Sequence, residues 1–149
     1  MKTTDYKVFP RHVGKWSGTL KVLDANMQQT KSYKTTQNWE QFEDKWVISN
    51  TYIDNDGTSK TNQYDVFPLG NGEVEYKTDS PKMKEVTMGA IEHGESTIYV
   101  QVVHQGTGKV LDLETMTLVS DTERVRTSQL FDREGVFKGL LVIVDSRVD

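Results

Sequence analysis

The chain has 149 residues, no cysteine and a net charge of −4. This length fits one domain, residues 1–149, that can bury a core without metals or disulfides. The lack of cysteine excludes a disulfide framework and a thiolate nucleophile, and the acidic balance argues against nucleic acid as a partner. No apolar run is long enough for a membrane-spanning helix, and no signal-type stretch follows Met1, so we expect a cytoplasmic protein without a membrane span.

Short segments of alternating apolar and polar residues begin at Arg11–Asp24. In this segment Trp16, Leu20 and Val22 share one face, while lysines and hydroxyl groups occupy the other. Side chains alternate between the two faces of a strand, so the pattern predicts a half-buried β-strand. The preceding residues form a lead-in whose Phe9 could plug one end of a barrel or serve as packing.

Nine further alternating segments follow, separated by turn residues and each too short or too irregular for a helix. Their approximate ranges are 30–42, 46–52, 61–67, 74–76, 83–91, 97–104, 110–119, 123–131 and 137–147, and Pro68 is expected to end the segment before it. Short turns favour antiparallel neighbours, and pairing the last strand with the first removes both bare edges. The sequence therefore predicts an all-β fold, a closed antiparallel up-and-down β-barrel of about 8 to 10 strands, just wide enough for a small ligand.

The sequence contains few signals for metal or nucleophile chemistry. His12, His93 and His104 lie on separate segments without the spacing of metal ligands. The turn that ends in Asp56-Gly57 lacks the ligand series of a calcium loop, and no nucleophile elbow is present. We expect no metal and no cofactor.

Charged residues stand out in the segments 110–119 and 123–131. Asp112 and Glu114 share a face with Met116, and Arg126 shares a face with Leu130. If these faces point inward, Arg126 would anchor a ligand carboxylate or carbonyl and Glu114 would be an acid or base of perturbed pKa, the two forming a charged pair in an apolar cup. If they point outward, the pair is an ordinary cross-strand contact on the outer wall. One bulge reverses strand parity, so both alternatives stay open.

A second group combines aromatic rings with side-chain amides. Trp39 and Tyr52 offer flat apolar surfaces with a hydrogen-bonding tip, and Gln37 and Asn50 could orient a ligand carbonyl. The alternative is that these rings only pack the barrel core, as is expected for Trp46. The candidate ligand-binding residues are Trp16, Gln37, Trp39, Asn50, Tyr52 and Gln129.

The residues Gly14-Lys15-Trp16, together with Arg147 near the end of the last strand, resemble the calycin pattern. In calycins (lipocalins and fatty-acid-binding barrels), a tryptophan of the first strand packs near an arginine from the end of the chain. Residues 12–19, 46–52, 114–118 and 124–131 resemble a cyanobacterial and algal family of lipocalin-like barrels catalogued as a domain of unknown function. The resemblance extends from about Pro10 to Arg147 and implies a calycin-like barrel.

The run Arg124-Val125-Arg126-Thr127-Ser128 is also similar to a run in the S-type phycobiliprotein lyases, which hold a bilin and transfer it to a cysteine. That resemblance implies a tetrapyrrole-sized cup with Arg126 facing a propionate, although the long helical segment of those lyases is missing here. Other lipocalin-like barrels, such as allene oxide cyclases, hold a reactive polyene in a folded shape, which requires little side-chain chemistry.

We therefore expect a barrel that binds one small hydrophobic molecule. The first hypothesis is a cyclase or isomerase acting on a polyene, terpenoid or polyketide, with Glu114 as acid or base and Arg126, helped by Asn50 or Gln129, polarising an oxygen. The alternatives are a non-catalytic carrier or bilin chaperone, and a filled barrel whose outer face binds a protein. The segment 139–144 is apolar on both faces, which suits either barrel closure or a homodimer interface.

Overall fold

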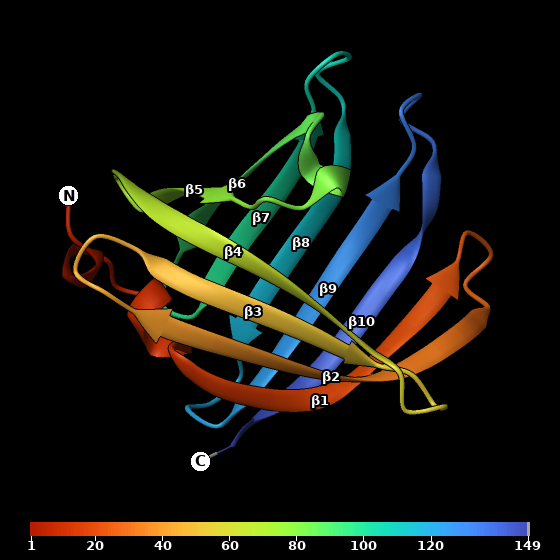
Figure 1. Ribbon diagram of the computed structural model, residues 1–149, viewed down its shortest axis with the longest axis horizontal. Coiled ribbons are helices and arrows are strands. Elements are labelled where there is room, and N and C mark those ends of the chain that lie inside the picture. Colours follow the sequence, from red (N-terminus) through yellow and green to blue (C-terminus); the bar gives the residue numbers. More distant parts are fainter. Residues whose placement is uncertain (149) are drawn as a thin grey trace.

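The computed structural model describes residues 1–148 and shows a closed barrel of ten antiparallel strands (Figure 1). Each strand pairs with the next in sequence, and the last strand pairs with the first. The predicted all-β up-and-down barrel is therefore confirmed. The strands are β1 (Gly14–Asp24), β2 (Gln29–Gln41), β3 (Trp46–Ile53), β4 (Ser59–Gly70), β5 (Glu73–Lys77), β6 (Val86–His93), β7 (Thr97–His104), β8 (Val110–Leu118), β9 (Glu123–Phe131) and β10 (Phe137–Val148).

Three short 3-10 helices, η1 (Thr3–Asp5), η2 (Phe9–His12) and η3 (Pro81–Met83), account for the main differences from the predicted strands. The first strand begins at Gly14 because the residues before it form η2, whose Pro10 suits a first helical turn. The strand β4 does not end at Pro68 as predicted. It continues to Gly70, because Pro68 lies at a register shift opposite Val74, where a missing N–H group is tolerated.

The seam between β1 and β10 closes the barrel. Leu20 lies opposite Ile143 in the register, and Gly18 lies opposite Asp145. A Cβ atom at Gly18 would overlap the Val144 carbonyl oxygen. Glycine at this position therefore lets the two strands approach closely enough to pair.

One end of the barrel, here called the plugged end, is closed by the helices η1 and η2 (Figure 1). Phe9 is fully buried against Trp46, with ring centroids 5.0 Å apart, as the plug prediction requires. The Glu92 carboxylate holds the plug by accepting hydrogen bonds from the backbone N–H groups of Lys7, Val8 and Phe9. The buried core cluster comprises Tyr6, Val8, Phe9, Trp16, Trp39, Trp46, Ile48, Val66, Val74, Tyr76, Ala90, Ile98, Val100, Met116 and Leu118.

The opposite end, here called the open end, has a gap in the hydrogen-bonded wall. The short strand β5 pairs with β4 only from Asp65 onward, so residues 59–64 of β4 pair with β3 on one edge and have no partner strand among residues 1–148 on the edge toward β5. Figure 1 shows β4 and the pair β5–β6 diverging there. Within residues 1–148, no helix has the length and apolar character needed to cross a membrane.

Candidate functional site

A buried cluster of charges lies inside the barrel, formed by Arg124, Arg126 and Asp145 and called the arginine–aspartate cluster below. Arg124 donates from Nε to Asp145 Oδ1 at 3.0 Å and from Nη2 to Asp145 Oδ2 at 2.9 Å. The Arg126 Nε atom lies 3.2 Å from the same Oδ2. One carboxylate thus faces two guanidinium groups, so the cluster itself carries excess positive charge.

The register between β9 and β10 brings the side chains of this cluster together. Arg124 on β9 lies directly opposite Asp145 on β10, and Arg126 lies opposite Ile143. Alternation along β9 then buries Arg124, Arg126 and Ser128 on the inner face. The sequence analysis did not select Asp145. The signal for it was a carboxylate two residues after Ile143, and so on the same face of an otherwise apolar strand.

Trp16 lies between two arginines. The guanidinium carbons of Arg124 and Arg147 each lie 4.3 Å from the centroid of its ring, and its Nε1 donates to the His12 carbonyl at 2.9 Å. This is the contact between a first-strand tryptophan and a chain-end arginine that the calycin resemblance implied. Cation–π attraction is strengthened when the groups are desolvated, as Trp16 is here.

A hydrogen-bonded chain connects the predicted amide and aromatic candidates to the arginine–aspartate cluster. The Gln37 Oε1 atom accepts from Trp39 Nε1 at 2.7 Å and from Arg124 Nη2 at 2.7 Å. The Gln37 Nε2 atom donates to Asn50 Oδ1 at 2.6 Å. The structure therefore brings Gln37, Trp39 and Asn50 together, with Trp39 in the sealed core and Asn50 nearer the open end.

Glu114 points inward from β8, as Met116 and Leu118 do on the same face. The expected direct ion pair with Arg126 is not formed, because Arg126 lies opposite Met116 while Glu114 lies opposite Ser128. Arg126 is paired with Asp145 instead. Burial raises the pKa of Glu114, and this effect outweighs the opposing effect of the Arg126 and Arg124 charges.

Asp112 is two residues from Glu114 on the same inner face and was given no role in the sequence analysis. Burial, followed by repulsion from Glu114, raises the pKa of Asp112 to about 7. Its Oδ1 atom is buried and has no hydrogen-bond partner among residues 1–148. This carboxyl group therefore gains and loses a proton near neutral pH.

Three tyrosines from adjacent strands face the same interior, Tyr52 on β3, Tyr64 on β4 and Tyr76 on β5. Burial raises the pKa of Tyr52 to about 12, and it also raises the pKa values of Tyr64 and Tyr76. The rings of Tyr64 and Tyr76 make an edge-on contact with centroids 5.9 Å apart. All three hydroxyl groups are therefore neutral at physiological pH and able to donate hydrogen bonds.

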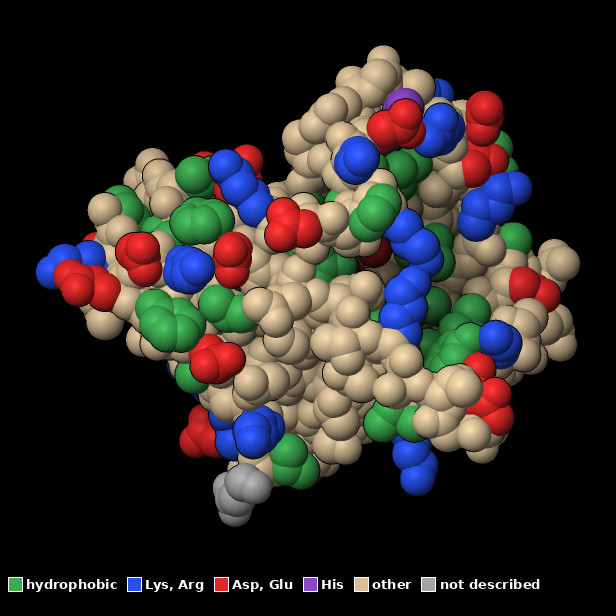
Figure 2. All heavy atoms as spheres, in the orientation of Figure 1, with side chains coloured by type: hydrophobic (Ala, Val, Ile, Leu, Met, Phe, Trp, Pro, Cys, Tyr) green, Lys and Arg blue, Asp and Glu red, His purple; other side chains and the backbone are tan. Residues whose placement is uncertain are grey.

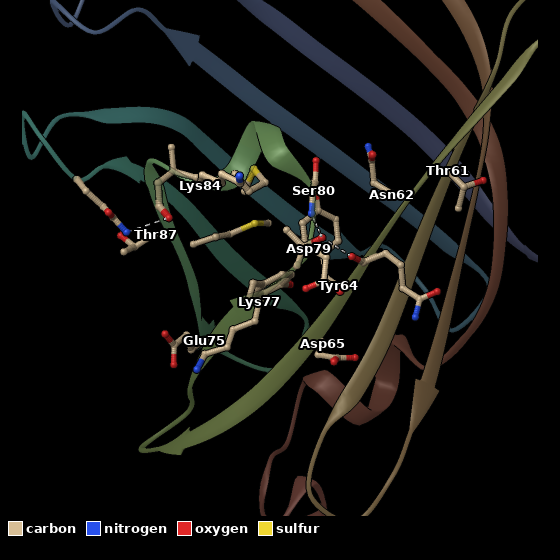
Figure 3. Close-up of a pocket in the computed structure, with 17 residues that line it drawn as sticks. Thr61, Asn62, Tyr64, Asp65, Glu75, Lys77, Asp79, Ser80, Lys84 and Thr87 are labelled. Atoms are coloured by element: carbon tan, nitrogen blue, oxygen red, sulfur yellow. Dashed lines mark hydrogen bonds between the residues drawn. The ribbon is translucent and has the colours of Figure 1, made fainter.

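Two cavities occupy the open half of the molecule. The larger, of about 860 Å³, lies between β4 and the β5–β6 side, and its lining includes Asn62, Tyr64, Tyr76 and Met88 (Figure 3). The smaller, of about 390 Å³, is lined by residues that include Leu20, Val22, Tyr33, Tyr52 and Leu141. Figure 2 shows the hollowed face, with apolar side chains in the wall and basic side chains across the opening.

Tyr52 lines the smaller cavity, whereas the other predicted site residues line neither of these two cavities. Trp16 is fully buried below the cluster, and Gln129 is exposed on the face of β9 opposite to that of Arg126 and Ser128. The residues described, 1–148, contain no group of three His, Cys, Asp or Glu side chains arranged to hold a metal ion.

Solved structures with similar folds share little sequence with this chain. A DUF3598-family protein from Nostoc punctiforme superposes with a TM-score of 0.67 at 16% identity, over 93% of this chain and 48% of that chain. The chain thus spans about half the length of that protein. The Mycobacterium tuberculosis protein Rv2717c superposes with a TM-score of 0.69 at 11% identity, over 95% of each chain. The barrel EF1p2_mFAP2b, solved bound to DFHBI, has a TM-score of 0.51 at 10% identity, over 95% of this chain and 98% of that chain.

At these identities the structural matches show the fold alone. None of the curated proteins matches the sequence significantly. The resemblance to S-type phycobiliprotein lyases stays a prediction. The family model described as "Domain of unknown function (DUF3598), N-terminal" matches residues 2–149. The chain therefore belongs to the DUF3598 family, in which it corresponds to the N-terminal domain.

Proposed function

We propose that the barrel binds one small, largely hydrophobic organic molecule in its open half. The observation that carries this proposal is the change along the inner face of β8. Met116 and Leu118 are sealed, with exposures of 2% and 5%, whereas Glu114 and Asp112 on the same face remain partly exposed. The core therefore ends at about Met116, and beyond it the interior is accessible to solvent.

The chemistry of the cavity walls supports the same proposal. Leu20, Val22 and Leu141 provide apolar surface in the smaller cavity. Glu114 and Arg126 line neither cavity but supply charged groups on the inner faces of β8 and β9. A mostly apolar cavity with a few placed polar groups is typical of small-molecule sites. Arg126 would donate a hydrogen bond to a ligand carbonyl or carboxylate, and the DFHBI-bound barrel is an example of a ligand-binding protein with a similar fold.

The second candidate function adds proton-transfer turnover, as in a cyclase or isomerase. It is favoured by the two inward carboxyl groups with raised pKa values, Glu114 and Asp112. A protonated carboxyl group could add a proton to one carbon of the substrate while a carboxylate removes one from another carbon. The substrate then isomerises or closes a ring with no net change in atoms and no cofactor. A carrier would use the same cavity without this step.

The test begins with native mass spectrometry of the protein purified from its source cells, followed by denaturation and identification of any released molecule. Release of one organic compound in stoichiometric amount is expected. That compound is then incubated with the protein to look for an isomeric product. The mass of the native ion also tests the homodimer alternative for segment 139–144, for which the outward Val144, 58% exposed on β10, is the relevant surface residue.

Variants separate turnover from binding. Glu114→Gln should lose turnover by about a hundredfold while retaining binding, because only the acid–base group is removed. The matched control is Asp121→Asn, whose side chain is 94% exposed near the plugged end. Equal loss of binding and turnover in Glu114→Gln would refute the catalytic role. A protein that carries no ligand from its source and binds none when supplied would refute the binding function.

A further inference from the structure

Asp112 is the inward charge that no cation balances. The two guanidinium groups of Arg124 and Arg126 are balanced by Asp145, which both contact, and by Glu114, whose pKa responds to both arginines. No Lys, Arg or His nitrogen among residues 1–148 lies within 4.0 Å of the Asp112 carboxylate. A buried carboxylate without a counter-charge is unfavourable, so an ionised Asp112 calls for a positive partner.

A second buried polar group of the barrel interior, on β5, is also without a hydrogen-bond partner. Tyr76 is only 8% exposed and lines the larger cavity, yet its Oη atom is buried and has no hydrogen-bond partner among residues 1–148. The Asp112 Oδ1 atom is unpartnered in the same way. A carboxylate oxygen only accepts hydrogen bonds, a tyrosine hydroxyl both donates and accepts them, and buried groups of either kind without partners are rare in folded proteins. A hydrogen-bond donor supplied from the cavity would satisfy the Asp112 oxygen and could also be accepted by the Tyr76 hydroxyl.

The aromatic surroundings select the kind of donor. The Glu114 charge acts on the pKa of Tyr52, Tyr64 and Tyr76, so all three tyrosines lie within its range. The Asp112 charge acts on Tyr52 and Tyr64 as well. The faces of aromatic rings attract cations, most strongly when water is excluded. Two carboxyl groups facing three tyrosines is an arrangement that favours an organic cation over a neutral donor.

We infer that the ligand carries a basic nitrogen, bound in its protonated form against Asp112 and the rings of Tyr64 and Tyr76. The inference rests on the proposed ligand-binding function and specifies the chemical class of the ligand. The apolar part of the ligand would then lie along the wall that includes Met88.

Two lysines at the rim favour a ligand of the opposite charge, which provides a clear alternative. Lys82 lies close to Lys60 and lowers the pKa of Lys60. Lys60 also lines the smaller cavity. A ligand recognised only at this rim would be an anion, and its affinity would be independent of Asp112.

The experiment uses three probes with one decyl chain and different head groups: decylammonium (decylamine in its protonated form), 1-decanol and decanoate. Isothermal titration calorimetry of the full chain is done with each probe below its micelle concentration. Decylammonium should bind about tenfold more tightly than decanol, and decanoate should bind no better than decanol. Asp112→Asn should lower the affinity for the cation about tenfold and leave decanol within about twofold, whereas the exposed control Asp121→Asn should change neither.

Two further measurements keep the inference falsifiable if Asp112→Asn folds poorly. Tyr64→Leu, at a partly exposed position, should weaken the cation severalfold more than decanol. In the unaltered protein, affinity for the cation should fall as the pH drops below about 7, because Asp112 then becomes neutral.

The outcomes separate this inference from the binding function itself. If decanol or decanoate binds and the cation has no advantage, or if the cation's advantage survives Asp112→Asn, the basic-nitrogen inference is wrong and the binding function stands. If the unaltered protein binds none of the three probes and carries no ligand from its source, both are overturned.

Discussion

His12 offers a quantitative test of the electrostatics of the plugged end. The residue is fully buried, its ring stacks on Trp39 with centroids 5.4 Å apart, and its Nδ1 lies 3.4 Å from Arg124 Nη1. Its Nε2 atom has no hydrogen-bond partner among residues 1–148. Burial, and next the charge of Arg124, lower the pKa of His12 from 6.5 to about 3.

The sign and size of the effect follow from proton linkage. Between pH 6.5 and pH 3 the unfolded chain holds a proton on His12 that the folded chain does not, so stability falls as the pH falls through this window. The slope approaches about 1.4 kcal/mol per pH unit once the unfolded His12 is fully protonated, so His12 alone should lower the free energy of unfolding by roughly 2.5 kcal/mol between pH 7 and pH 4.5. The perturbation is His12→Phe, which keeps an aromatic ring against Trp39 and removes the titration.

The assay is urea unfolding of the unaltered protein and His12→Phe at pH 7 and pH 4.5. Buried carboxyl groups titrate in both proteins, so the difference between their free energies of unfolding isolates His12. That difference should shift by about 2 to 3 kcal/mol in favour of the variant on acidification. Any loss of packing in the variant adds a constant offset that does not depend on pH. A shift below about 0.5 kcal/mol would show that His12 titrates normally, and it would refute the argument.

Three further substitutions test the fold. Gly18→Ala should lower the melting temperature by at least about 10 °C, because its Cβ would overlap the backbone of β10, and wild-type stability would disprove the close approach. Glu92→Gln should lower the free energy of unfolding by about 1 to 3 kcal/mol and speed amide exchange at Phe9, because the charged acceptor of three backbone N–H groups becomes neutral. Unchanged exchange at Phe9 would contradict that role of Glu92. Asp145→Asn should lower the free energy of unfolding in urea by about 3 to 5 kcal/mol, because it removes the carboxylate that both buried arginines contact. A loss under about 1 kcal/mol would argue against the cluster.

The strands were predictable from sequence because the alternation of apolar and polar residues has the period of a strand and the turns contain glycine and aspartate. The segments 97–104 and 123–131 were correct to the residue. The direction in which Glu114 and Arg126 point was left open. The two buried residues Met116 and Arg126, which lie opposite each other in the register, show that both strands turn these faces inward.

The partners inside the barrel were not predictable, because they depend on register between strands. Register shifts occur at Phe137/Gly139 and at Val102/Val103, and each moves one strand relative to its neighbour. Asp145 lies opposite Arg124 only in the register that results. The sequence analysis suggested Phe9 as a plug but not the contacts that hold it, because Glu92 accepts hydrogen bonds from residues more than 80 positions earlier in the chain.

The position of the plug has a consequence for how this barrel can diversify. The tryptophans, the plug and the arginine–aspartate cluster lie at one end, whereas the walls of the two cavities, which include Leu20, Tyr64 and Met88, lie at the other. Substitutions in that wall remove little of the sealed packing, so most of them should leave the folded state intact. Natural evolution or a library of variants can therefore change the residues that line the cavities to suit a new ligand, while the packing of the sealed end keeps the barrel folded.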